Sequence, residues 1–122
     1  MDLVRRSVEV ILAGQSPSGG YVACPRFANY RYSWLRDGCF VADAMREHGE
    51  LESCDRFLDW CARIVMRSPD GPFHARYTLD GEQDPSGWPH HQIDGWGLFL
   101  GTIRRRGSAR WGEPAARVAH WL

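Results

Sequence analysis

The feature that most constrains this chain is a long apolar stripe over residues 51–67. Its members recur at alternating intervals of three and four residues, and neighbouring apolar positions widen the stripe: Leu51, Cys54, Phe57, Leu58, Trp60, Cys61, Ile64 and Val65. This spacing places all of them on one side of an α-helix. Because a face this wide has to be covered by other elements, the chain must build a packed helical core.

The same periodicity predicts four further helices, over about 2–14, 36–48, 92–106 and from about 113 to Leu122. Residues 21–34 are expected to be extended, with a break at Pro25, and residues 68–91 form a long polar connection rich in Pro, Gly and Asp. Connections this long are uncommon inside a compact domain and are often functional. We therefore expect an all-α domain in which both long connections lead into a helix.

Composition excludes several classes of function. The 122 residues suffice for one domain, and 15 basic residues balance 15 acidic ones, which argues against a dedicated nucleic-acid binder. The one basic cluster, Arg104-Arg105-Arg106, falls where a helix should end and where cations complement the helix dipole. No apolar run approaches the roughly 18 residues of a membrane span, and no signal-peptide pattern is present. We expect a cytoplasmic protein with neither a nucleic-acid nor a membrane partner.

Cysteine and histidine patterns give no support for a metal or redox centre. The four cysteines form no C-x-x-C pair, and Cys54 and Cys61 belong to the helical stripe, so reduced, core-facing thiols are expected. His90, His91 and Asp94 could be read as ligands, but adjacent histidines usually point apart and no further well-spaced ligand is evident. We expect no cofactor.

The tract Tyr30-Arg31-Tyr32-Ser33-Trp34-Leu35-Arg36-Asp37 carries the clearest functional pattern. In an extended segment its three aromatic residues at even positions would share one face. Arg36 and Asp37 then add a rigid donor fork and a carboxylate acceptor. Flat rings beside planar polar groups suit a sugar, which has apolar C–H faces and a rim of hydroxyls. The alternative is a half-buried strand followed by an exposed helix start.

A second tract, Trp88 to Gly97, repeats this chemistry, with an aromatic residue, polar side chains and then an acid at a helix start. Asp37 and Asp94 could each simply complement the dipole of a helix N-terminus. Six tryptophans in 122 residues are a surplus of a kind often found at recognition surfaces. Two long connections with matched chemistry favour a shared binding site.

These tracts carry a resemblance to a known family. The resemblance is to the opening of the glucoamylase-like catalytic domain of glycoside hydrolase family 15. Its blocks agree in order and approximate spacing: Arg6-Ser7 with Val10 to Leu12, Gly20 to Pro25, Tyr30 to Asp37, and Trp88 to Gly95 with its Gln-Ile-Asp-Gly run. The resemblance spans nearly the whole chain, from about Arg6 to past Ile103. It implies an (α/α)6 toroid, of which the five helices expected here are a part.

The resemblance also implies roles for individual residues. Arg36 and Asp37 would hold hydroxyls of the terminal glucose, Tyr30 would lie near the reacting centre, and Trp34 would support the Arg-Asp pair. The second tract would contribute Trp88, along the substrate path, together with Gln92 and Asp94. This chain has His90 where fungal glucoamylases carry Arg, so the glucan linkage is left open.

The general acid and general base of the family lie downstream of the Gln-x-Asp-Gly block. An inverting glycosidase needs two carboxyl groups roughly 6.5–9.5 Å apart, and no glutamate of this chain lies in such a motif: Glu9, Glu47, Glu50, Glu52, Glu82 and Glu113. A complete toroid needs roughly several hundred residues. We therefore interpret residues 1–122 as the N-terminal part of a catalytic domain, without catalytic residues of its own and dependent on the rest of the domain.

The sequence thus predicts a hydrolase of α-glucans or related α-glucosides, which releases terminal glucose with inversion and whose terminal-sugar recognition residues lie in this chain. Its partner would be an oligosaccharide or polysaccharide substrate. Two alternatives remain open: a non-catalytic sugar-sensing or regulatory module with a glucoamylase-like fold, and a helical interaction domain whose aromatic tracts are core.

Overall fold

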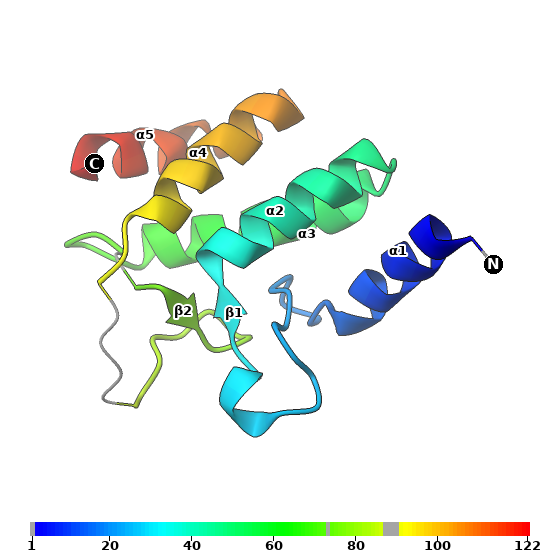
Figure 1. The fold of residues 1–122 in the computed structure, drawn as a ribbon. Helices are drawn as coiled ribbons and strands as arrows, with labels where there is room; N and C mark the ends of the chain where they lie inside the picture. The colour runs from blue at the N-terminus through cyan, green and yellow to red at the C-terminus, as the bar shows by residue number, and fades with distance from the viewer. Residues whose placement is uncertain (1, 73, 87–90) are drawn as a thin grey trace.

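A computed structural model describes residues 2–72, 74–86 and 91–122. Within these ranges the chain forms five α-helices and one pair of two-residue strands (Figure 1). The helices are α1 (Leu3–Gly14), α2 (Leu35–Glu47), α3 (Leu51–Met66), α4 (Asp94–Arg106) and α5 (Gly112–Trp121), and the strands are β1 (Ser33–Trp34) and β2 (Arg76–Tyr77). Each predicted helix is present within about two residues of its expected bounds, which confirms an all-α domain. None of the helices in these ranges is long and apolar enough to cross a membrane.

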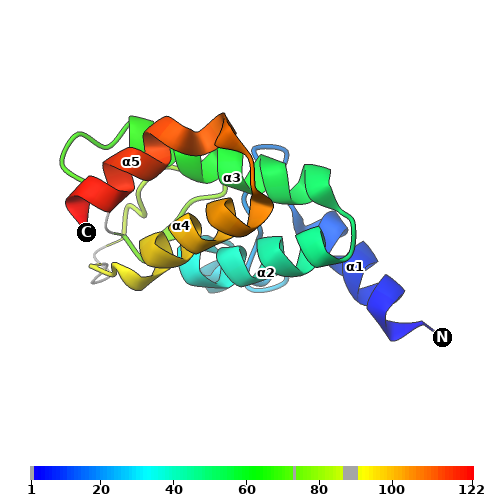
Figure 2. The ribbon, with the colours of Figure 1, turned by 90° about the horizontal axis from the view of Figure 1, so that it is seen from above.

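The core lies among four of the helices. α2 packs against α3 and α4, and α5 packs against the same two helices (Figure 2). A chain of aromatic rings, with centroids between 5.1 and 6.3 Å apart, runs through this core: Tyr21, Phe57, Trp60, Tyr77, Trp96 and Phe99. The wide stripe of α3 accounts for much of this core, as its periodicity predicts.

Three tryptophans are buried in this core with their indole N–H groups satisfied. Trp60 donates to the Leu79 carbonyl at 2.9 Å, Trp96 to the Pro72 carbonyl at 2.6 Å and Trp111 to Asp59 at 2.9 Å. A buried indole needs such a partner, and the bonds of Trp60 and Trp96 also tie the connection after α3 to the helices. Much of the tryptophan surplus therefore serves the core and not a recognition surface.

The N-terminal end of helix α1 extends away from the other helices (Figures 1 and 2), while its partly buried Val8 and Ile11 pack against the core. Asp2 caps its N-terminus by accepting from the N–H groups of Val4 and Arg5. At its other end Gln15 donates to the Ser53 carbonyl at 3.0 Å and accepts from the Ser53 hydroxyl at 2.9 Å. The helix is thus attached at its C-terminal end, and much of its apolar surface stays exposed: Leu3, Val4, Val10 and Leu12.

The long polar connection expected between α3 and α4 contains a short strand, β2, and a tight turn. Strand β2 pairs with β1 in antiparallel register, with Ser33 opposite Tyr77 and Trp34 opposite Arg76. A tight turn at Gly81, where φ is +83°, brings Gln83 back beside Tyr77. This short strand was not predicted from the sequence, because two-residue strands show no hydrophobic period. It places a hairpin directly beside the first aromatic tract.

The segment before α2 is extended only in part. A 3₁₀ turn, η1 (Ala28–Tyr30), interrupts it, and only Ser33–Trp34 pairs as a strand. The three aromatic side chains still gather, since the Trp34 ring centroid lies 6.1 Å from that of Tyr30 and 6.2 Å from that of Tyr32. The expected clustering is therefore present, although a turn and a short strand produce it.

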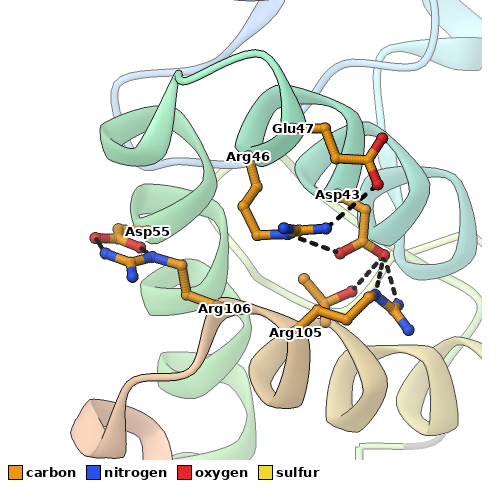
Figure 3. Close-up of polar contacts among 7 residues, drawn as sticks. Asp43, Arg46, Glu47, Asp55, Arg105 and Arg106 are labelled. Carbon is orange, nitrogen blue, oxygen red and sulfur yellow. Dashed lines mark hydrogen bonds and ion pairs between the residues drawn. The ribbon is translucent and has the colours of Figure 1, made fainter.

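The basic cluster at the end of α4 does more than complement the helix dipole. Arg105 donates to Asp43 Oδ2 of α2 from both Nε, at 3.1 Å, and Nη2, at 2.5 Å (Figure 3). Arg106 donates to the two carboxylate oxygens of Asp55 of α3, at 2.6 and 3.0 Å. Asp43 Oδ2 also accepts from the Thr102 hydroxyl at 3.3 Å. Charge-assisted contacts of this forked kind are stronger than neutral hydrogen bonds. They fasten the C-terminal end of α4 to both neighbouring helices.

Candidate functional site

The two predicted recognition tracts meet where the N-termini of α2 and α4 lie together. β1 leads directly into α2, so Arg36 and Asp37 occupy the first turn of that helix, and Asp94 is the first residue of α4. Arg36 Nη1 donates to Asp94 Oδ2 at 2.9 Å across a sequence separation of 58 residues. This ion pair joins the Arg-Asp of the first tract to the Asp-Gly of the second.

Gly95 makes this approach sterically possible. A Cβ atom at this position would lie 2.6 Å from Leu35 Cβ and 3.1 Å from the Arg36 backbone nitrogen. A contact of 2.6 Å is far inside van der Waals distance, so any larger residue would push the two helix ends apart. The glycine of the Gln-Ile-Asp-Gly run therefore has a packing role at the site.

Both partners of the ion pair are held in their charged forms, although each side chain is about half exposed, at 46% and 48%. The hydrogen bond from Arg36, helped by the Gly95 N–H, outweighs burial and lowers the pKa of Asp94 below its ordinary value. The same contact raises the pKa of Arg36. The pair forms a fixed polar edge between the two helix ends.

A hollow of about 460 Å³ adjoins this edge. Its lining combines aromatic, aliphatic and acidic side chains: Tyr21, Val22, Ala23, Tyr30, Trp34, Asp37, Gly38 and Val41. Asp37 is exposed, and within the described ranges its side chain makes no hydrogen bond and no ion pair. It is therefore a carboxylate with its acceptor positions available to a ligand, beside aromatic rings that could contact the apolar face of a sugar.

A second hollow, of about 610 Å³, meets the first at Tyr30 and Trp34. Its remaining lining residues are Ala28, Asn29, Tyr32, Arg76 and Ser86. Tyr30, Tyr32 and Trp34 thus form an aromatic wall that borders the two hollows. An amide, a guanidinium and a hydroxyl face the second hollow, which gives it more polar character than the first.

The buried Arg76 contacts this aromatic wall. Its guanidinium carbon lies 4.3 Å from the centroid of the Tyr32 ring and 5.2 Å from that of Trp34. Arg76 Nε also donates to Asp84 Oδ2 at 2.5 Å. Burial alone would raise the pKa of Asp84, but hydrogen bonds from Ser86 and Arg76 outweigh it and lower the pKa to about 2. The carboxylate is therefore ionised beside its partner.

Sequence reasoning missed Arg76 and Asp84 because both lie in the connection that was read as a polar loop. One signal could have pointed to them: the run His74 to Thr78, bounded by Pro72 and Gly81, contains a strand-like Ala-Arg-Tyr-Thr. Nothing in the sequence pairs Arg76 with Trp34, since that contact depends on strand register.

The structure places most of the predicted site residues. Tyr30, Trp34 and Asp37 line the first hollow, and Arg36 and Asp94 form the adjoining pair. Gln92 is exposed two residues before Asp94, with no side-chain hydrogen bond within the described residues. Trp88 lies outside the described residues. What each of them does to a ligand stays a prediction.

Neither hollow has a glutamate among its described lining residues. Several glutamates form ion pairs elsewhere, such as Glu82 with Arg67 at 3.0 Å and Glu113 with Arg117 at 3.1 Å. Over residues 2–72, 74–86 and 91–122, no group of three or more potential metal ligands lies close enough together to hold an ion.

The sequence profile of glycosyl hydrolases family 15 matches residues 1–117. The chain belongs to that family. The match begins before the first recognition tract and continues through α4 into α5, so it includes both tracts and the ion pair that joins them.

Two named relatives align with this chain over a small share of their own length. An isomaltose glucohydrolase from Kribbella flavida is 33% identical over 121 residues, which cover 84% of this chain and 31% of the relative. Trehalase 2 from Sulfolobus acidocaldarius is 31% identical over 93 residues, covering 66% of this chain and 16% of the relative. The chain therefore spans less than a third of the length of these two proteins.

Solved family structures share the fold. A wild-type glycosidase matches 99% of the chain with a TM-score of 0.86 and 30% identity, and the chain covers 39% of that structure. A glycosidase E335A variant in complex with glucose matches with the same TM-score, identity and coverage. These matches confirm the predicted fold class: the chain is an all-α part of a glycosidase toroid.

Proposed function

We propose that the complete protein is a glycoside hydrolase that releases terminal glucose from an α-glucoside with inversion, and that residues 1–122 are the N-terminal part of its catalytic domain. In this proposal the chain holds the terminal sugar. The observation that carries it is the Arg36–Asp94 ion pair, which joins the two recognition tracts at the residue next to Asp37, and Asp37 lines the first hollow.

The polar groups at this hollow suit hydrogen bonding to the hydroxyl groups around the edge of a sugar ring. A carboxylate such as Asp37 accepts hydrogen bonds from two hydroxyls, and charge-assisted contacts are stronger than neutral ones. Arg36, oriented by Asp94, supplies N–H donors in a fixed plane. A site that satisfies hydroxyls in this way also discriminates against sugars that lack them. Tyr30 and Trp34 would contact the C–H face of the ring.

Hydrolysis would require groups from the rest of the domain. An inverting glycosidase uses a general acid and a general base roughly 6.5–9.5 Å apart, and the described lining of the two hollows holds one carboxylate and no glutamate. We therefore assign no catalytic residue to this chain. The missing acid and base would come from later helices of the same toroid.

The names of the relatives favour a glucoside as substrate. One relative is an isomaltose glucohydrolase, another is a trehalase, and one matched structure holds glucose. All three names involve glucose or a glucose disaccharide, which agrees with a site for terminal glucose. The His90 position gives no preference among linkages.

The test is hydrolysis of isomaltose, maltose and trehalose by the complete protein, with the anomer of the released glucose followed by NMR. Inversion predicts that the glucose unit attacked at its anomeric carbon appears first as the β anomer, whereas the leaving glucose keeps its own form. Trehalose should therefore give equal amounts of α- and β-glucose, and isomaltose or maltose an initial excess of β-glucose over the equilibrium mixture. An initial excess of α-glucose would contradict the inverting mechanism. Glucose binding without hydrolysis of any of the three would instead favour a sensing or regulatory module.

Asp37→Asn separates recognition from structure. Because the Asp37 side chain has no partner within the described residues, its amide analogue should change the free energy of unfolding by less than about 1 kcal/mol, the scale of a helix-dipole contact. The loss of charge-assisted hydrogen bonds, at about 1.5–3 kcal/mol, should weaken glucose binding at least about tenfold. Glu52→Gln, on the exposed surface of α3, is the matched control. Equal glucose affinity in both variants would favour a plain helical interaction domain.

A further inference from the structure

We propose that Arg76 and Asp84 form a positioning pair that holds Tyr32 and Trp34 of the aromatic wall in the arrangement required for sugar binding. The inference rests on the proposed function, since it concerns the same sugar site. It extends that function to a hairpin that contributes no lining residue to the first hollow.

The geometry connects the pair to the wall through the sheet register. Trp34 and Arg76 are directly opposite each other in the β1–β2 pairing, and cross-strand neighbours of this kind interact through their side chains. The Arg76 guanidinium lies within 4.3 Å of the Tyr32 centroid and 5.2 Å of the Trp34 centroid. Both distances fall in the range of a cation–π contact. One cation thus contacts two rings of the wall.

The hairpin brings Asp84 to the other side of Arg76. The Thr78 N–H donates to the Glu82 carbonyl at 2.9 Å, and the Gly81 N–H donates to the Thr78 carbonyl at 2.8 Å. This closed turn returns the chain so that Asp84 lies beside Arg76, eight residues earlier. Ser86 adds a contact to Arg76 Nη2 at 3.3 Å. The guanidinium nitrogens are therefore held by hydrogen bonds to Asp84 and Ser86, while the guanidinium carbon lies over two rings of the wall.

Burial makes the pair interdependent. The Arg76 side chain is 9% exposed and that of Asp84 is fully buried. A charge taken out of water is costly unless partners compensate it, so removal of one member takes a buried ionic partner away from the other. Arg76 without the Asp84 carboxylate would be drawn toward water and away from Tyr32 and Trp34. The pair therefore acts on the sugar through the rings.

The experiment compares two carboxylate-to-amide changes within the same hairpin of the complete protein. Asp84→Asn removes the buried partner of Arg76, whereas Glu82→Gln removes the exposed partner of Arg67, which does not contact the wall. We expect Asp84→Asn to raise the Kd for glucose and the KM for isomaltose about fivefold or more, on the scale of cation–π contacts. Its kcat should change far less. Glu82→Gln should leave both constants unchanged.

A double-mutant cycle separates positioning from a general loss of structure. If Asp84 acts through Trp34, Asp84→Asn should have little further effect on the glucose Kd in a Trp34→Ala background. Arg76→Lys, which keeps the charge but loses the planar face, should reproduce most of the effect of Asp84→Asn. An unchanged effect of Asp84→Asn in the Trp34→Ala background would overturn the inference. So would equal glucose affinity for Asp84→Asn and Glu82→Gln.

The two proposals fail in distinguishable ways. If the wild-type complete protein binds no glucose and hydrolyses no glucoside, the proposed function fails and this inference falls with it. If the wild type binds glucose and Asp84→Asn binds it equally well, the sugar site stands and only the positioning role of the pair is overturned.

Discussion

Three carboxylates near the recognition tracts differ in how firmly the structure holds them. Asp94 accepts from Arg36 at 2.9 Å, Asp84 accepts from Arg76 at 2.5 Å while buried, and Asp37 has no side-chain partner within the described residues. The first two orient cations, and the third is available to a ligand. In the proposed site the three carboxylates therefore have different roles. Asp94 and Asp84 hold the guanidinium groups of Arg36 and Arg76, and Asp37 would accept hydrogen bonds from the sugar.

The depressed pKa of Asp84 predicts how its contribution to stability depends on pH. Its folded pKa of about 2 lies below the ordinary value for an aspartate. The carboxylate therefore stabilises the folded state fully above about pH 4 to 5, and this contribution is lost as pH falls through about 4 toward the folded value. The free energies of unfolding of the complete wild-type protein and of Asp84→Asn should differ most near pH 6, by roughly half as much at pH 3, and converge toward pH 2. A difference that stays constant over this range would show that the carboxylate charge is not what stabilises the hairpin.

At the scale of the elements, what the sequence could predict depended on the length of the periodic pattern. α3 repeats its stripe over four turns, so its existence and buried face were foreseeable. β1 and β2 have two residues each and show no period. The Arg36–Asp94 pair joins two tracts that were both predicted, but their contact follows from the packing of α2 against α4. Local pattern thus indicated the parts of the site, and tertiary packing determined how they meet.

The crossing of α2 and α4 at the site yields a prediction with an internal control. Gly95→Ala would place a Cβ 2.6 Å from Leu35 Cβ, so the helix ends must separate. Overpacking of this kind costs about 1–3 kcal/mol. Gly97→Ala, two residues along the same helix, meets nothing within 4 Å and should stabilise the helix by up to about 1 kcal/mol. Denaturant unfolding of both variants of the complete protein measures whether the free energy of unfolding falls for Gly95→Ala and rises for Gly97→Ala. A neutral or stabilising Gly95→Ala would contradict the close approach of the two helices.

At the scale of the whole molecule, α4 is fixed at both ends. Arg36 holds its N-terminal residue, and Asp43 and Asp55 hold Arg105 and Arg106 at its C-terminal end (Figure 3). The site therefore lies at one end of a bundle whose opposite end is fastened by ion pairs. By contrast α1 leaves Leu3 71% exposed, and we propose that later helices of the domain cover this face.

The four thiols test whether this packing persists in the complete protein. Cys39, Cys54 and Cys61 are buried within the α2–α3–α4 core, whereas Cys24 is partly exposed. Burial raises the pKa of Cys39 to about 12 and that of Cys54 to about 11, and it raises the pKa of Cys61 as well. Because the thiolate is the reactive species, these three should resist alkylation in the native state.

Labelling with iodoacetamide at pH 8, followed by peptide mass mapping, should therefore modify Cys24 and spare the other three until the protein is unfolded in guanidinium. Cys24→Ser should remove the native label from this segment, and Cys61→Ala should not, provided that the loss of one buried sulfur leaves the protein folded. Native labelling of Cys39 is the decisive contrary result. Its sulfur lies 3.7 Å from the Gly95 carbonyl, so a reagent could reach it only if α2 and α4 separate at the site end of the bundle. Such separation would also break the Arg36–Asp94 contact on which the proposed sugar site depends.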